Sequence, residues 1–156
     1  MAATKTQGTQ LYYASAAAAV TAVAPVISMT GLDSGALDQI DTTLLTATSR
    51  SFVAGLANPG AITVELLFDP LDATLQAFVA LKDAGANKSW CIGLSDGTTA
   101  PTASASVIVQ PAAASRSSVK FDGFVSGLVI DMPSNDVVKA TATIQTSGNF
   151  TWVYHT

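Results

Sequence analysis

The chain has 156 residues, enough for one domain that buries a core without disulfides or a structural metal. Charged residues make up 12% of the sequence and hydrophobic residues 49%, whereas soluble proteins carry roughly 25% charged residues. The net charge is −4, from 7 Lys and Arg against 11 Asp and Glu, and no basic run occurs. This composition argues against disorder and against nucleic-acid binding through phosphates. It favours a surface largely covered by other protein.

Most of the chain has the patterns of β-strands, and the clearest is Ala61–Phe68, in which Ile62, Val64 and Leu66 share one face. Ser15–Ala24 is of low complexity and is expected to be a connection. The other predicted strands are Gln10–Ala14, Val26–Thr30, Gln39–Leu45, Lys88–Leu94, Ala103–Gln110, Val119–Met132, Val137–Thr146 and Asn149–Tyr154.

One helix is predicted, at about residues 70–83. Asp69 is a suitable N-cap, Pro70 suits the first helical position, and Gly85 can end the helix in a left-handed conformation. Its apolar face consists of Leu71, Leu75, Phe78, Val79 and Leu81. The predicted fold is therefore mainly β, an antiparallel β-sandwich or barrel with one flanking α-helix.

Residues that usually carry catalysis or bind metals are scarce. The one cysteine, Cys91, lies between Trp90 and Ile92, which indicates a buried thiol, and the one histidine, His155, is next to the C-terminus. Nucleophilic enzymes need a firmly held imidazole, and zinc sites need three or four ligands. We therefore expect no enzymatic activity, no cofactor and no metal.

Three pairs of aspartates lie close together in the sequence and could in principle serve a glycosidase. Helix capping accounts for Asp69 and Asp72, and the turn before Val137 accounts for Asp136. Asp38 and Asp41 are less fully explained, but their spacing alone is weak evidence for a metal site.

The N-terminal region contains an uncharged, Ala-rich stretch, Leu11–Met29. Its hydropathy is modest and Pro25 interrupts it, which disfavours a membrane-spanning helix. A secretory signal is the stronger alternative, because Lys5 precedes the stretch and Ala22-Val23-Ala24 resembles a cleavage site. In that case the protein would be a secreted β-sandwich module that binds a carbohydrate or protein ligand.

A long segment, Thr46–Gly60, is rich in small residues and ends in the turn sequence Asn58-Pro59-Gly60. Long segments without regular structure are usually functional or disordered. We expect this one to be a loop that is mobile in the free chain and becomes ordered when it docks on a neighbour, where it would bury four candidate interface residues, namely Arg50, Phe52, Val53 and Leu56. The alternative is an ordinary packed hairpin loop.

The order and spacing of several segments resemble a known family. These segments are Gly31-Leu32, Asp38-x-Ile40-Asp41-x-Thr43, Arg50-x-Phe52-Val53-x-Gly55-Leu56, Ile62-Thr63-Val64-Glu65, Phe68-Asp69-Pro70, Phe124-Val125, Ile130-Asp131-Met132-Pro133 and Asp136-Val137-Val138. Together they resemble the major tail tube proteins of long-tailed, non-contractile, siphovirus-type bacteriophages, over roughly Gly8 to Thr146. The Ala-rich stretch before Pro25 and the aromatic end, Phe150–Tyr154, depart from the family pattern.

This resemblance implies one tail-tube domain over residues 1–156, with the assembly loop at about 46–60. It implies a structural virion protein of the tail, assembled in the host cytoplasm, whose hexameric rings stack into the tube for DNA ejection. The partners implied are further copies of the chain, a tape measure protein in the lumen, and tail terminator and distal tail proteins at the ends. Duplex DNA would pass without specific binding, and no membrane is involved. The low charge and the net charge of −4 suit such a lumen.

Overall fold

The computed structural model describes residues 3–23 and 25–156, and it is built around an antiparallel sheet with the strand order β2-β1-β7-β10-β11-β6-β3. Two further strand pairs, β4-β5 and β8-β9, lie outside this sheet. The strands are β1 (Gln10–Ala16), β2 (Ala19–Val23), β3 (Val26–Thr30), β4 (Ala36–Asp41), β5 (Phe52–Asn58), β6 (Ala61–Leu67), β7 (Lys88–Gly93), β8 (Thr102–Ser104), β9 (Val107–Val109), β10 (Ser118–Asp131) and β11 (Lys139–Val153). The prediction of a mainly antiparallel β fold with one helix is confirmed.

The core lies between the curled main sheet and the single helix, α1 (Ala73–Ala84). Trp90 on β7 is fully buried and makes an edge contact with Phe78 of the helix, with ring centroids 5.9 Å apart. The alternation predicted for Ala61–Phe68 is confirmed, because Ile62, Val64 and Leu66 face the core. Burial of these side chains supplies the main driving force for folding.

The helix begins three residues later than predicted. Asp72 is the N-cap, and its carboxylate accepts a hydrogen bond from the Thr74 backbone N–H at 2.8 Å. Asp69 instead accepts from the Leu71 N–H and opens a separate turn before the helix. Gly85 ends the helix in the left-handed conformation, as predicted.

The Ala-rich N-terminal stretch is part of the sheet, so the prediction of an irregular connection over Ser15–Ala24 is wrong for its described residues. β1 pairs with β2 on one side and with β7 on the other. Leu11 and Tyr13 of β1 are buried in the core. Residue 24, at the end of the possible cleavage site, lies outside the described residues.

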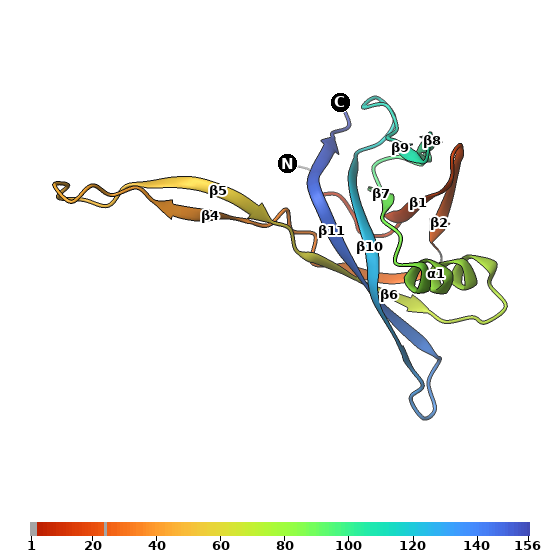
Figure 1. Ribbon diagram of the computed structural model, residues 1–156. Coiled ribbons are helices and arrows are strands. Elements are labelled where there is room, and N and C mark those ends of the chain that lie inside the picture. The colour runs from red at the N-terminus through yellow and green to blue at the C-terminus, as the bar shows by residue number, and fades with distance from the viewer. Residues whose placement is uncertain (1–2, 24) are drawn as a thin grey trace.

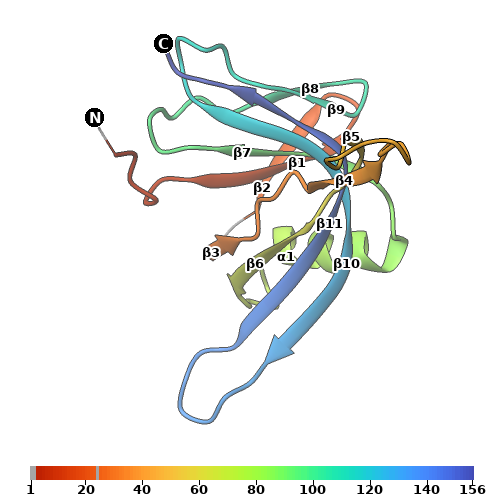
Figure 2. The ribbon, with the colours of Figure 1, turned by 90° about the vertical axis from the view of Figure 1, so that its left-hand side faces the viewer.

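The longest strands, β10 and β11, form one hairpin that runs the length of the molecule (Figures 1 and 2). The two strands predicted at Val137–Thr146 and Asn149–Tyr154 are one continuous strand, β11. Its pairing with β10 is irregular where β10 passes from Lys120 to Asp122. The strand predicted over Ala103–Gln110 is instead the short hairpin of β8 and β9.

Candidate functional site

A β-hairpin made of β4 and β5 projects far from the main sheet, and we call it the arm (Figures 1 and 2). The prediction of a long loop over residues 46–60 is therefore wrong in its local structure, because Phe52–Asn58 forms strand β5. Only residues 42–51, at the tip, are without strand. The predicted strand Gln39–Leu45 likewise ends earlier, since β4 ends at Asp41.

The arm exposes an unusual number of large apolar side chains. Phe52 and Val53 are about half exposed and Leu56 is 86% exposed, while Arg50 is exposed at the tip. Four further apolar residues of the arm are exposed, although no sequence pattern singled them out as interface residues, and they are Leu37, Ile40, Leu44 and Leu45. A two-stranded hairpin is at best marginally stable in water, so this one is suited to docking on another surface.

The base of the arm is shaped by two glycines in the left-handed region, Gly31 and Gly35, both at φ +83°. A Cβ atom on Gly35 would lie 2.1 Å from the Asn58 carbonyl oxygen, so no larger residue fits there. The Asp33 carboxylate accepts a hydrogen bond from the Gly35 N–H at 2.9 Å and closes the turn. These two glycines therefore allow the chain to turn sharply from the body into the arm.

One part of the main sheet has a free edge on both sides. It consists of β3, β6, β11 and the second half of β10, and its two outer strands are each paired on one side only. β3 pairs with β6 only, and within the described residues the segment 124–131 of β10 pairs with β11 only. We call these four strands the open sheet. Unpaired edges expose backbone N–H and C=O groups and invite pairing with another chain.

The pairing register connects residues of one unpaired edge with residues of the other in straight rows across the four strands. One row across the open sheet runs from Met29 through Val64 and Ala142 to Leu128, and a second runs from Val26 through Leu66 and Ala140 to Ile130. All these side chains lie on the core side, because Val64, Leu66, Ala140 and Ala142 are buried. Each row therefore ends at both edges in an apolar residue.

The outer face of the open sheet is mostly polar on the central strands, and it carries three exposed apolar side chains toward its margins, Leu67, Phe124 and Val129. It presents Ser28, Thr63, Glu65, Thr141 and Thr143, which alternate with the buried residues of the same strands. The Ser28 hydroxyl donates to the Glu65 carboxylate at 2.7 Å. The basic residues on or beside this face are Lys120 and Lys139, and Lys139 forms an ion pair with Asp136 at 3.1 Å.

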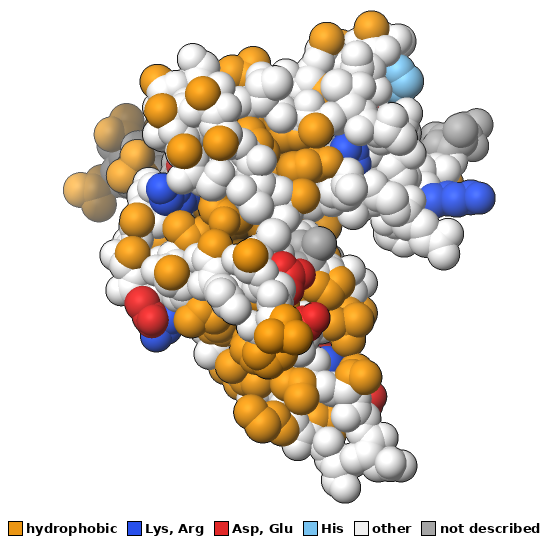
Figure 3. Space-filling view, turned by 90° about the vertical axis from the view of Figure 1, so that its right-hand side faces the viewer, with side chains coloured by type: hydrophobic (Ala, Val, Ile, Leu, Met, Phe, Trp, Pro, Cys, Tyr) orange, Lys and Arg blue, Asp and Glu red, His pale blue; other side chains and the backbone are white. Residues whose placement is uncertain are grey.

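Another part of the surface is also poor in charge. Figure 3 shows hydrophobic side chains over much of the face that lies to the right in Figure 1, with few charged groups among them. The turn of the β10–β11 hairpin and the residues before α1 add exposed apolar side chains, including Leu71, Met132 and Val137. Such a surface is typical of a protein that is covered by neighbours.

The residues considered for chemistry do not form a reactive centre. Cys91 is fully buried, and burial raises the pKa of its thiol to about 11. His155 lies 3.8 Å from the Asp96 carboxylate, and hydrogen bonds from the Thr43 side chain and backbone lower the pKa of Asp41. Within residues 3–23 and 25–156, no three His, Cys, Asp or Glu side chains come together in a way that could hold a metal. The described helix is too short to cross a membrane.

The unpaired edges, the projecting arm and the low charge together define a subunit of a protein assembly. The chain belongs to the lambda-like phage tail tube family, whose pattern it matches over residues 2–156. It is 39% identical over 148 residues to structural protein 3 of Pseudomonas phage PAJU2, a match that covers 92% of this chain and 90% of the relative.

Solved structures of low sequence identity share the fold. The sheath/tube terminator of the PVC extracellular contractile injection system is 13% identical, with a TM-score of 0.68 and 97% of each chain covered. A chain from the tail of an empty GTA particle, with C6 symmetry, is 12% identical, with a TM-score of 0.65, and 96% of this chain and 98% of that chain are covered.

The resemblance seen in the sequence is thus confirmed: the protein is a structural component of the phage virion tail and forms its tube. The alternative of a secreted binding module is not favoured. A signal cleaved near residue 23 would remove β1 and β2, and with them Leu11 and Tyr13 from the core.

Proposed function

We propose that six copies of this chain form a ring and that the rings stack into the tube, with residues 1–156 acting as one tail-tube domain. The observation that carries the proposal is the open sheet, which has unpaired strands at both edges and at the same level. A ring pairs every such edge and leaves none exposed. The C6 symmetry of the GTA tail supports six as the number of copies.

The strand directions are compatible with such a ring. Neighbours in the open sheet are all antiparallel, so β3 and β10 run in opposite directions in one copy. Rotation about the ring axis preserves the direction of every strand along that axis. The β10 strand of one copy therefore meets β3 of the next in antiparallel orientation, and the closed sheet has one pairing type throughout.

The arm supplies a second set of contacts, to a copy in the same or the adjacent ring. Phe52, Val53 and Leu56 are each half exposed or more, so the residues that the structure describes leave much of their surface uncovered. Burial of an apolar side chain contributes about 1.5–3 kcal/mol, so a few of these residues in each copy suffice to tie neighbours together. Arg50 at the tip would add a charged or hydrogen-bonded contact.

The mostly polar outer face of the open sheet would line the lumen. Its hydroxyl groups and carboxylates offer no continuous basic track that would hold phosphates, so duplex DNA would pass without specific binding. By family resemblance, a tape measure protein would occupy the lumen before DNA, and tail terminator and distal tail proteins would close the ends. In this role the protein has no enzymatic activity, and assembly would take place in the host cytoplasm.

The decisive experiment is electron microscopy of the purified protein over a range of concentrations, together with sedimentation analysis. We expect rings and tubes with sixfold symmetry, whose abundance rises with concentration. A protein that stays strictly monomeric at high concentration, or tubes with another symmetry, would contradict the proposal.

A further inference from the structure

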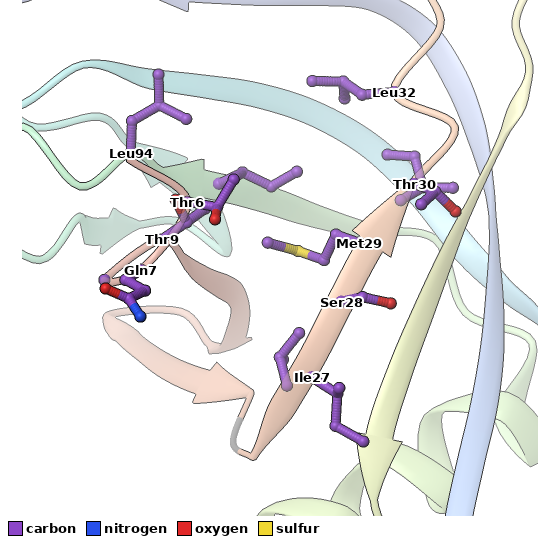
Figure 4. A pocket seen from close by; sticks show the side chains of 13 residues that line it. Thr6, Gln7, Thr9, Ile27, Ser28, Met29, Thr30, Leu32 and Leu94 are labelled. Atoms are coloured by element: carbon purple, nitrogen blue, oxygen red, sulfur yellow. The ribbon is translucent and has the colours of Figure 1, made fainter. Parts of the chain in front are cut away.

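The structure contains a cleft of mixed lining, with apolar side chains on β3 and the end of β7 and polar ones on residues 6–9, that none of the described residues fills. It lies between β3 on one side and residues 6–9 with the end of β7 on the other, and its volume is about 580 Å³. Ile62 and Ile92 line part of it, so the cleft opens onto the main core. Figure 4 shows Met29 extending from β3 across the cleft toward Thr6 and Thr9. None of the described residues that line it carries a charge.

The cleft follows the unpaired edge of β3, so an occupant has to satisfy two requirements. It must be an extended segment that pairs with this edge, and it must place apolar, uncharged side chains on the core side. Met29 and Val26 mark that side of β3, because they align with the buried Val64 and Leu66.

We propose that the cleft is filled by Leu128 and Ile130 from β10 of a second copy, an inference that rests on the ring described above. These two residues end the rows that begin at Met29 and Val26, and they lie on the core side of the other unpaired edge. Ile130 is 39% exposed within its own chain, whereas Leu128 is half-buried at the margin of its own core and would meet the neighbour with its outer side. The segment from Gly127 to Ile130 is uncharged, which matches the cleft.

Each ring contact would thus join two hydrophobic cores as well as two strand edges. Leu128 and Ile130 would continue the apolar layer of Val64 and Ala142 into the neighbour, while the outer face stays mostly polar. The contact would be heterologous, because one copy supplies β10 and the other the cleft, and such contacts build closed rings or filaments.

Disulfide trapping tests this directly. Three double variants, Met29→Cys/Leu128→Cys, Val26→Cys/Ile130→Cys and Met29→Cys/Ile130→Cys, cover the aligned register and a shift of two residues. Within one chain the two edges are three strand spacings apart, about 14 Å, too far for a disulfide. Cys91 is fully buried and adds no reactive thiol.

We expect oxidation of assembled tubes to give a covalent ladder up to the hexamer for at least one of these pairs, and no ladder for the single-cysteine variants. Tubes that give no ladder with any of the three would overturn the inference and leave the ring proposal standing. A ladder from Met29→Cys/Leu45→Cys instead would place the arm tip in the cleft and would also overturn it. An unmodified protein that forms no rings would count against the ring itself.

A charge in the cleft provides a second test. Ile27 lines the cleft and is 48% exposed, and Val107 on β9 lies outside it with 45% exposure. We expect Ile27→Asp to keep the fold but to raise the concentration needed for assembly at least tenfold, whereas Val107→Asp leaves it within about twofold. Equal assembly of the two variants would overturn the inference.

Discussion

The Nη2 atom of Arg116 donates a hydrogen bond to the carbonyl oxygen of Gly8 at 3.0 Å, although the two residues are 108 positions apart. Arg116 is fully buried, and no ion pair of the described residues includes it. Its guanidinium also donates to the carbonyl oxygens of Gly93 and Leu94, at 2.8 and 2.6 Å. It therefore ties the segment before β1 to the end of β7, and this segment forms one wall of the cleft.

We expect Arg116→Met to lower the free energy of unfolding by about 3 kcal/mol or more, because several buried carbonyl groups lose their donor. Chemical denaturation of the free subunit measures this change. Arg50→Met is the matched control, since Arg50 is exposed, and its effect should stay within about 0.5 kcal/mol. Equal effects of the two variants would show that the buried hydrogen bonds do not stabilise the fold.

We expect Phe52→Ala to impair assembly much more than folding. Phe52 is half exposed in the subunit, so its removal should change the free energy of unfolding by less than about 1 kcal/mol. Tube formation, followed by sedimentation, should fall sharply. Phe121→Ala provides the contrast, because Phe121 is buried and its truncation should cost about 3–5 kcal/mol of stability. Normal assembly of Phe52→Ala would argue against a docking role of the arm.

Hydrogen exchange should distinguish the free arm from the docked arm. In the subunit, β4 and β5 pair only with each other, so their amides should exchange rapidly. In tubes the same amides should become protected. The amides of β7, which is paired on both sides, should be protected in both states. Strong protection of the arm in the free subunit would contradict docking on assembly.

The buried thiol of Cys91 should make stability fall at alkaline pH. Burial raises its pKa from 9.0 to about 11, so the folded state keeps a proton that the unfolded state releases. This contribution to stability is complete below about pH 9 and is lost as the pH rises toward 11. Relative to Cys91→Ala, the unmodified protein should lose about 2 kcal/mol more between pH 8 and 11. Parallel curves for the two proteins would refute this assignment.

A basic residue on the outer face of the open sheet should make the lumen retain DNA. Glu65→Lys repeats in every copy, so tubes of this variant should bind short duplex DNA with an affinity that falls steeply between about 50 and 200 mM salt. Unmodified tubes and Glu65→Gln tubes should bind little. Cosedimentation of labelled duplex with tubes measures the effect, and equal binding by all three would show that this face does not meet DNA.

The sequence predicted elements whose signals are local. The alternation of Ile62, Val64 and Leu66 and the capping glycine Gly85 both act within a few residues, and both predictions are confirmed. The helix start was placed too early because Asp69 and Asp72 each cap a turn, and local signals cannot rank two good caps. Strand β2 was missed because its hairpin turn, Ala17–Ala18, contains none of the usual turn residues.

The candidate site was predicted only in part. Thr46–Gly60 was identified by its length, its small residues and its closing turn, but strand β5 within it lacks the period-two alternation, because both faces of the arm meet solvent. The unpaired edges of β3 and β10 could not be found in this way. They follow from a register that aligns Met29 with Leu128 through two intervening strands, and such long-range pairing has no local signal.

In the proposed ring, the four strands of the open sheet would also set the bore of the tube. Six copies give a closed sheet of about 24 strands, and a spacing of about 4.8 Å gives a circumference near 115 Å and a diameter of about 37 Å. Strand tilt would widen this further, and the side chains of the outer face, which include Glu65 and Lys139 beside Ser and Thr, would narrow it. In that ring, backbone hydrogen bonding would fix the calibre of the wall itself, so surface substitutions would alter what the wall attracts more than what fits through it.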